Sequence, residues 1–449
     1  MPHWTEESIF YHIYPLGLTG APPRNDLHAA PVPRLEQLYA WLDHIQWQGA
    51  NALYLGPLFE STAHGYDTAD YFHVDRRLGT DDTLAAFAAE VHRRGMRLIL
   101  DGVFNHVGRD FWAFRDVQAR GAASDYCGWF ANLRFEGQSP YGDPFQYEGW
   151  AGHYDLVKLN LHNPAVVEHL LLAVSSWMQR FEIDGLRLDA ADVVDRGFLQ
   201  TLSAHCRQQR PGFWMMGEVV HGDYRQWANP DMLDSVTNYE CYKGLYSSHN
   251  DRNYFEIAYA LNRQFAEGGI YRSLGVYNFV DNHDVNRLAS VLEEPAHTYP
   301  LHILLFCMPG VPSIYYGSEW GLPGKKNGHS DADLRPILDL AESSRMAQQP
   351  ELAAVIRRLA ALRRSSSTLQ RGSYRQVLVQ HEQLAFLRQS GDESMLVAVN
   401  SASQPASIAC QLSGRWEDVL NPGEEFSANG ASLKLEIPAF WGRILRQVG

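Results

Sequence analysis

The sequence predicts an α/β fold, a (β/α)8 barrel with an inserted domain after its third strand and a C-terminal antiparallel β-sandwich. Three observations support this prediction. Eight short apolar runs alternate with helix-like stretches between residues 9 and 318. A long segment without clear periodicity, 107–162, interrupts that alternation. Beyond residue 366 the pattern changes to short alternating strands separated by Gly, Asn and Ser turns.

The predicted barrel strands are short, and several are apolar on both faces, as parallel strands covered on both sides should be. They occupy residues 9–15, 51–57, 96–102, 185–191, 213–219, 234–240, 275–281 and 312–318. So many strands in alternation with helices favour a closed barrel over an open sheet.

Signals at helix ends mark the connecting helices. The segment 81–95 begins with a capping signal and ends at a glycine. Asn163 followed by Pro164 gives a second helix a cap and a first-turn proline. The apolar residues after it recur at helical spacing: Val167, Leu170, Leu171, Val174 and Met178.

These patterns predict three domains. The barrel comprises residues 1–106 and 163–366, and its last helix covers 351–366. The inserted domain, 107–162, is rich in Trp, Tyr, Gly and Asp. The β-sandwich comprises residues 367–449.

Composition argues against several classes of protein. The net charge of −14 disfavours nucleic acid and anionic membrane surfaces, which attract Lys and Arg. No apolar run approaches the length of a membrane span, and the N-terminus lacks the pattern of a secretory signal. Five scattered cysteines without CxxC pairing indicate reduced thiols. We therefore expect a cytoplasmic protein, whose oligomeric state the sequence leaves open.

Charged residues gather where the predicted strands end, which is where barrels place functional groups. Asp189, Glu218 and Asp284 follow three different strands. Arg187 lies two positions before Asp189, so both side chains point to the same face of the strand. Grouped carboxylates shift one another's pKa and are retained mainly where chemistry needs them.

This arrangement suits one type of catalysis. Arg187 would keep Asp189 ionised and therefore nucleophilic, whereas Glu218, in a less polar setting, would stay protonated and act as a general acid. A retaining glycosidase uses such a pair of carboxyl groups.

At these residues the sequence resembles the α-amylase family, glycoside hydrolase family 13. Its motifs occur in family order as DGVFNHVG (101–108), GLRLDAADV (185–193), MGEVV (216–220) and FVDNHD (279–284). Two further signatures are HGYDTADY (64–71) and GVPSIYYGSE (310–319). LVKLN (156–160) resembles the inserted-domain signature of cyclomaltodextrinase and neopullulanase members.

The resemblance implies a role for each matching residue. Asp189 is the nucleophile, Glu218 the acid and base, and Asp284 a third carboxylate that grips sugar hydroxyls. Substrate contacts are expected from Tyr66, His106, Arg187, His221 and His283. For His221, packing within its loop is the alternative.

A metal site is left open. Asn105 matches a calcium ligand of many α-amylases, but 107–162 shows no identifiable partner acid. Typical α-amylases carry Lys-His after the second motif, where Asp192 and Val193 stand here, so both the calcium site and the leaving-side contacts are in question. We expect no required cofactor, with calcium at Asn105 as the alternative.

Other residues have structural interpretations. We expect Glu319 and Arg335 to form an ion pair near the eighth strand and Asp67 to be structural. The tryptophans of the insert either line a sugar groove or form the core of the inserted domain: Trp112, Trp129 and Trp150.

The predicted function is hydrolysis of α-1,4-glucosidic bonds, with retention, in maltooligosaccharides, cyclodextrins or related α-glucans. A 4-α-glucanotransferase on the same scaffold and an α-1,6-acting relative are the alternatives, and Ala190 favours the α-1,4 bond. A non-catalytic binding protein is disfavoured because all three carboxylate positions are filled. The expected partner is an oligosaccharide substrate, with neither nucleic acid nor membrane.

Overall fold

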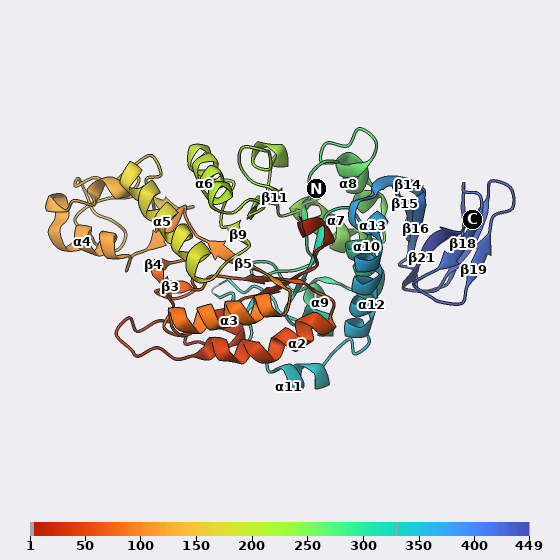
Figure 1. Cartoon of the computed structure of the whole chain (residues 1–449), viewed down its shortest axis with the longest axis horizontal. Helices are drawn as coiled ribbons and strands as arrows, with labels where there is room; N and C mark the ends of the chain where they lie inside the picture. The colour runs from red at the N-terminus through yellow and green to blue at the C-terminus, as the bar shows by residue number, and fades with distance from the viewer. Residues whose placement is uncertain (1–3, 329, 449) are drawn as a thin grey trace. The chain divides into compact units, whose positions relative to one another are not determined.

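A computed structural model describes residues 4–328 and 330–448. Its largest sheet has eight strands in the order β11-β10-β9-β5-β2-β1-β13-β12. Figure 1 labels β5, β9 and β11 of this sheet. The bounds of the eight strands are β1 (Phe10–Ile13), β2 (Ala52–Leu55), β5 (Arg97–Gly102), β9 (Gly185–Leu188), β10 (Trp214–Gly217), β11 (Ser235–Val236), β12 (Tyr277–Asn278) and β13 (Val311–Tyr315). A parallel bridge from Thr237, which follows β11, to Tyr277 of β12 links the two ends of this order. The predicted (β/α)8 barrel is confirmed, and each predicted barrel strand is present.

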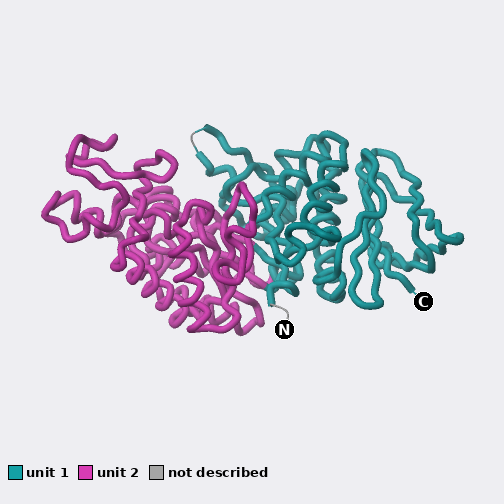
Figure 2. Tube along the Cα trace, turned by 90° about the horizontal axis from the view of Figure 1, so that it is seen from above, with its two compact units in different colours: residues 1–11, 44–51, 237–449 teal, residues 12–43, 52–236 magenta. Residues whose placement is uncertain are grey.

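The chain forms two compact units (Figure 2). Unit 1 contains the described residues of Met1–Tyr11, His44–Asn51 and Thr237–Gly449. Unit 2 contains His12–Asp43 and Ala52–Val236. These two units do not correspond to the three predicted domains and do not test their boundaries, which stay predictions.

Unit 2 carries the helices that follow the early barrel strands. They are α1 (Pro15–Leu18), α3 (Asp81–Arg93), α4 (Trp112–Arg120), α5 (Pro164–Arg180) and α6 (Arg196–Gln209). The predicted Asn163 cap forms, because its side chain accepts the Ala165 N–H. The other helix is capped one residue before the predicted segment 81–95, by Thr80, whose hydroxyl accepts the Thr83 N–H. Capping satisfies amide groups that would otherwise lack a partner at the first turn.

The segment after β5 builds a small antiparallel sheet of its own, in the order β6-β8-β7. Its strands are β6 (His106–Gly108), β7 (Gly149–Trp150) and β8 (His153–Lys158). A hairpin, β3 (Phe59–Ser61) and β4 (Thr68–Val74), lies earlier in the same unit. A Cβ added at Gly108 would lie 2.4 Å from the Asp67 carbonyl oxygen, so only glycine fits there.

The helices of unit 1 follow the later barrel strands. They include α7 (Tyr239–Asn250), α8 (Phe255–Phe265), α9 (Leu288–Val291), α10 (Thr298–Cys307), α11 (Leu340–Arg345), α12 (Leu352–Ser365) and α13 (Ser367–Arg371). A further helix, α2 (Tyr39–Trp47), contributes residues to both units. No helix in the described parts of the chain combines the length and hydropathy needed to cross a membrane.

The C-terminal part is the predicted antiparallel β-domain. One sheet has the order β14-β15-β16-β21-β18-β19, and β17 pairs with β20 in a second. The strands are β14 (Ser373–Val379), β15 (Gln383–Ser390), β16 (Glu393–Asn400), β17 (Ala406–Cys410), β18 (Arg415–Asp418), β19 (Glu425–Ser427), β20 (Leu433–Ile437) and β21 (Trp441–Val448). Buried side chains from both sheets, such as Leu396 and Leu435, share one core.

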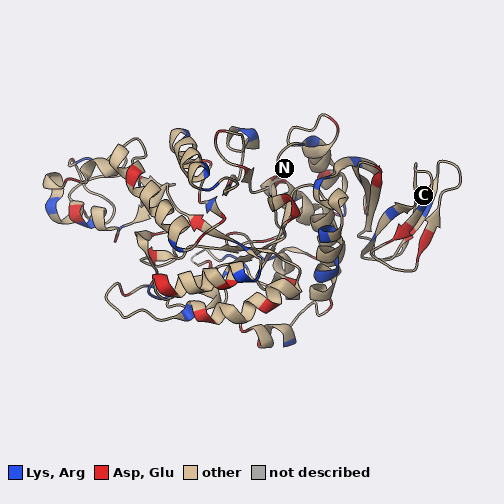
Figure 3. Ribbon diagram, in the orientation of Figure 1, with Lys and Arg blue, Asp and Glu red and all other residues tan. Residues whose placement is uncertain are grey.

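Two buried arginines hold the end of α10. One of them, Arg363, belongs to α12, a helix that carries several blue basic segments in Figure 3. Arg363 donates to the Phe306 carbonyl at 2.9 Å, and Arg388 donates to the Cys307 carbonyl at 2.6 Å. Burial lowers the pKa of Arg363 to about 10 and that of Arg388 to about 9. Both cations lie at the negative end of the helix dipole, where carbonyl groups need donors.

Candidate active site

Arg187 is the centre of a buried charge cluster in unit 2. Its Nη1 donates to Asp189 Oδ1 at 2.8 Å and to Asp101 Oδ1 at 3.0 Å, and its Nη2 lies 2.7 Å from Glu218 Oε2. We call these four residues the Arg187 cluster. Burial alone would lower the pKa of Arg187, but the Asp101 and Glu218 carboxylates raise it well above its ordinary value.

The register of the parallel strands brings the cluster together. Arg187 on β9 pairs with Asp101 on β5, so both side chains stand at one level of the sheet. Asp189 and Glu218 each lie one residue beyond a strand, and their N–H groups continue the ladders to Gly102 and Leu188. Alternation along β9 then points Arg187 and Asp189 to the same face.

The backbone after the nucleophile candidate is strained. Ala190 has a φ of +47°, a left-handed conformation that a residue with a Cβ rarely adopts. In this conformation its N–H donates to Glu218 Oε2 at 3.1 Å. The strain therefore coincides with a contact that fixes the Glu218 carboxylate beside Asp189.

Glu218 differs from the expectation in one respect. The sequence interpretation gave it a less polar setting than Asp189, but the structure places its carboxylate against the Arg187 guanidinium. The reason is that Arg187 presents two amino groups: Nη1 bonds Asp189 and Asp101, and Nη2 contacts Glu218. Asp101, the first residue of the motif at 101–108, is the third carboxylate on the same arginine.

His106 is the clearest candidate for a substrate contact. It is 1% exposed, and burial lowers its pKa to about 3, so the ring is neutral at pH 7. Its Nε2 lies 3.8 Å from Asp189 Oδ2, too far for a hydrogen bond. Within the described residues this buried nitrogen has no hydrogen-bond partner. A neutral imidazole nitrogen left in this position is free to bond a sugar hydroxyl.

Tyr66 is also part of this surface. Its hydroxyl donates to Asp101 Oδ2 at 3.0 Å, and the Arg187 guanidinium lies 5.8 Å from its ring centre. Asp67 next to it is buried in the β3–β4 connection, consistent with its structural interpretation. The role of Tyr66 in stacking on a bound sugar stays a prediction.

The three tryptophans of the insert divide between the two interpretations. Trp112 and Trp129 pack on each other at 5.3 Å and on His169, in an aromatic cluster of the insert. Trp150 instead lies 5.5 Å from the His106 ring and is half-buried. Trp150 therefore lies beside a predicted substrate contact, and its place in a sugar groove stays a prediction.

We expect Trp150→Ala to raise KM for maltotetraose roughly tenfold with a smaller change in kcat, because a large stacking surface is lost. Trp112→Ala is the matched control, since Trp112 is 39% exposed and belongs to the other cluster. Steady-state kinetics of both variants test this. An unchanged KM for the Trp150 variant would contradict the assignment.

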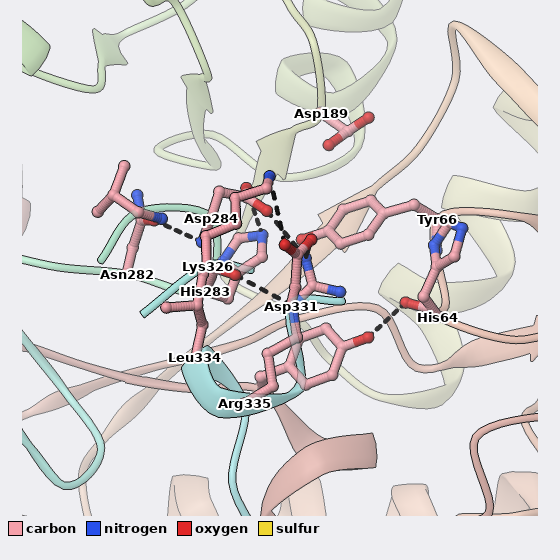
Figure 4. A network of polar contacts seen from close by, with 12 residues as sticks. His64, Tyr66, Asp189, Asn282, His283, Asp284, Lys326, Asp331, Leu334 and Arg335 are labelled. Carbon is pink, nitrogen blue, oxygen red and sulfur yellow. Dashed lines mark hydrogen bonds and ion pairs between the residues drawn. The ribbon is translucent and has the colours of Figure 1, made fainter. Parts of the chain in front are cut away.

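Unit 1 holds a second polar cluster, around Asp284 (Figure 4). Arg335 Nη2 lies 2.9 Å from Asp284 Oδ1, and His283 Nε2 lies 2.8 Å from Asp284 Oδ2. The Asp284 N–H donates to Asn282 Oδ1 at 2.8 Å. Arg335 also contacts Asp331 at 3.3 Å. Both oxygens of Asp284 are therefore held by basic side chains.

The expected ion pair between Glu319 and Arg335 is wrong. Glu319 is buried and accepts from the Tyr11 hydroxyl at 2.5 Å, with His44 Nε2 at 2.7 Å. Arg335 instead holds Asp284, a role that the sequence interpretation missed. The one local signal was Asp331, four residues earlier in the same loop, which pairs with the same arginine.

His221 lies exposed in the connection after β10. Burial raises the pKa of Asp192, and the Val220 backbone and the His221 ring oppose this shift. Asp192 therefore lies beside the Glu218 loop, where the resemblance expects a basic residue. The role of His221 as a substrate contact stays a prediction.

The role of Asn105 as a calcium ligand stays a prediction. Its side-chain nitrogen lies 3.2 Å from His106 Nδ1, and its carbonyl accepts the Leu159 N–H. Within residues 4–328 and 330–448, no group of three or more His, Cys, Asp or Glu side chains is placed to hold one ion. Calcium prefers several oxygen ligands, and carboxylates are prominent among them.

Chelation is accordingly expected to change neither kcat nor the midpoint of thermal unfolding. The measurement compares the protein before and after dialysis against EDTA. A loss of activity that Ca²⁺ restores and Mg²⁺ does not would contradict this expectation.

The fold and the Arg187 cluster define a class of protein, a (β/α)8-barrel enzyme with a paired-carboxylate site. Residues 34–352 match the family model described as alpha amylase, catalytic domain, and residues 374–444 match maltogenic amylase, C-terminal domain. The chain belongs to the alpha-amylase family.

Individual relatives agree with this assignment. A cyclomaltodextrinase from a Bacillus species is 32% identical over 432 residues, which cover 92% of this chain and 76% of the relative. An intracellular maltogenic amylase from Bacillus subtilis (strain 168) is 30% identical over 82% of this chain and 63% of its own. Among solved structures, the ligand-free cyclic α-maltosyl-(1→6)-maltose hydrolase from Arthrobacter globiformis superposes with a TM-score of 0.84, at 27% identity over all of both chains.

Proposed function

We propose that this chain is a retaining hydrolase of α-1,4-glucosidic bonds in soluble maltooligosaccharides, cyclodextrins or related α-glucans. The observation that carries the proposal is the single guanidinium of Arg187 that holds Asp189 on one nitrogen and Glu218 on the other. A retaining mechanism needs carboxyl groups about 5 Å apart, and one shared arginine favours such a short separation.

Asp189 acts as the nucleophile. Its carboxylate attacks the anomeric carbon, and the bond from that carbon to the leaving oxygen breaks. Glu218 gives its proton to the leaving oxygen in this step. It then takes a proton from the incoming water, which displaces Asp189 and restores the α configuration. Arg187 orients Asp189 through the 2.8 Å hydrogen bond to its Oδ1.

Other side chains bind the sugar. His106 offers its unpartnered nitrogen, and Tyr66 and Trp150 offer ring surfaces. Asp284, with His283 beside it, takes the part of the third carboxylate that the family resemblance implies. Arg335 joins the assignment because it holds Asp284.

The relatives support hydrolysis of an oligosaccharide. They include a cyclomaltodextrinase and a maltogenic amylase, and neither name favours a transferase or a non-catalytic protein. The intracellular relative supports a cytoplasmic location. We accordingly take small soluble α-glucans as the substrate, with neither nucleic acid nor membrane as partner.

A product profile over time tests this function. The protein is incubated with maltotetraose, β-cyclodextrin, pullulan and soluble starch, with Asp189→Asn as the control. We expect shorter sugars and an equal rise in reducing ends, fastest on the oligosaccharides. Longer sugars with no net rise in reducing ends would indicate a transferase, and no change in any substrate would overturn the proposal.

A further inference from the structure

Arg287 is a fully buried arginine three residues beyond Asp284. Its Nη1 donates to the Tyr316 carbonyl at 2.9 Å and its Nη2 to the Leu334 carbonyl at 3.0 Å. Its guanidinium lies 4.6 Å from the centre of the Tyr315 ring. The hydrogen bonds of this buried cation therefore go to the backbone of one loop and not to a carboxylate.

That loop, 316–336, follows β13, and the structure describes its residues 316–328 and 330–336. It is attached to Arg287 at a third point. The Arg287 N–H donates to the Gly324 carbonyl at 3.0 Å. A Cβ added at Gly324 would lie 3.0 Å from Arg287 Cδ and 2.2 Å from the Asp333 carbonyl oxygen. The Tyr315 hydroxyl also donates to the Leu334 carbonyl, at 2.9 Å. The loop is thus wrapped tightly around one side chain.

The anchored carbonyl is next to a residue of the candidate site. Leu334 precedes Arg335, whose Nη2 holds Asp284 at 2.9 Å and whose Nε donates to the His283 carbonyl at 3.0 Å (Figure 4). Segment 283–287 is therefore tied to the loop through Arg287, through Asn286, whose Oδ1 accepts the Lys326 N–H at 2.7 Å, and through the Arg335 side chain. The Arg287 bond to the Leu334 carbonyl lies directly beside Arg335 in the chain.

We propose that Arg287 is a positioning residue, which fixes the 316–336 loop so that Arg335 holds the Asp284 carboxylate in one orientation. The inference rests on the proposed function, because the orientation of Asp284 matters only where it grips substrate. An error of about 1 Å in the placement of a site group can lower a rate about a hundredfold. Arg287 acts through Arg335, and its effect should disappear when Arg335 is gone.

A double-mutant cycle tests this coupling. Lysine keeps the charge of Arg287, but its ammonium cannot donate as a fixed fork to two carbonyls. We expect Arg287→Lys to lower kcat/KM on maltotetraose about tenfold, mostly through kcat, for the loss of one charged hydrogen bond. In the Arg335→Ala background the same change should lower kcat/KM by less than about twofold.

Arg363→Lys is the matched control. Arg363 is 1% exposed and likewise donates to backbone carbonyls, those of Phe306 and Gly310. Arg363→Lys should reduce thermal stability as Arg287→Lys does, but it should leave kcat/KM within about twofold of the unmodified protein. A purely structural role for Arg287 predicts instead that both lysine variants behave alike.

Two results would overturn the inference: equal losses of kcat/KM from Arg287→Lys with and without Arg335, or equal losses from the two lysine variants. If Arg287→Lys does not fold, Tyr315→Phe replaces it, because it removes one donor to Leu334. We expect about a threefold loss from this variant, again only with Arg335 present.

Asp284→Asn distinguishes failure of this inference from failure of the proposed role of Asp284. If it is inactive while Arg287→Lys is normal, only this inference fails, and if it is fully active, the proposed role of Asp284 fails.

Discussion

Replacing Asp189 with asparagine should lower kcat on maltotetraose by about ten-thousandfold or more, as removal of a nucleophile does in other enzymes. An amide cannot form the glycosyl ester. Its oxygen can still accept the 2.8 Å hydrogen bond from Arg187, so the variant should stay folded. Initial rates of reducing-end release, with circular dichroism of the same samples, measure the effect.

Asp195→Asn is the control for this experiment. Asp195 caps α6 by accepting the Phe198 N–H at 2.9 Å, and asparagine caps equally well. The control makes the same chemical change six residues away and should keep its activity. Near-normal turnover by the Asp189 variant would remove that residue from the mechanism.

Glu218→Gln should lose roughly as much activity on natural substrates, because no proton reaches the leaving oxygen. The loss should be smaller on α-maltosyl fluoride, since fluoride leaves without protonation. Azide should then accelerate turnover, because it attacks the glycosyl-enzyme without needing a base. The expected product is an α-glycosyl azide, detected by NMR.

Azide should not restore activity to Asp189→Asn, which forms no intermediate to intercept. A β-glycosyl azide from the Glu218 variant would indicate direct displacement and would contradict the two-step mechanism. An absence of any rescue would remove Glu218 from the acid and base role.

The barrel was predictable because its signals are local. Apolar runs and helix caps at Thr80 and Asn163 lie within a few residues of what they determine. The small sheet of 107–162 was not predicted, since its strands are two to six residues long and pair through β-bulges. Such short strands carry no readable period.

The sequence predicts which charged residues gather at the candidate site, but not which of them pair with one another. Asp189 and Glu218 follow strands, so their gathering follows from the parallel topology alone. The partner that a long side chain reaches does not follow from the topology. Arg335 reaches Asp284, 51 positions away, and Glu319 meets the Tyr11 hydroxyl, 308 positions away. Neither contact leaves a pattern in the nearby sequence.

Trapping the covalent intermediate tests the central claim most directly. Glu218→Gln is incubated with α-maltosyl fluoride, quenched in acid, digested with pepsin and analysed by mass spectrometry. Formation of the intermediate is fast because fluoride needs no acid, and its breakdown is slow because the base is missing. We predict one maltosyl group on the peptide that contains Asp189. A maltosyl group on another carboxylate, or β-maltose released without any adduct, would contradict the account.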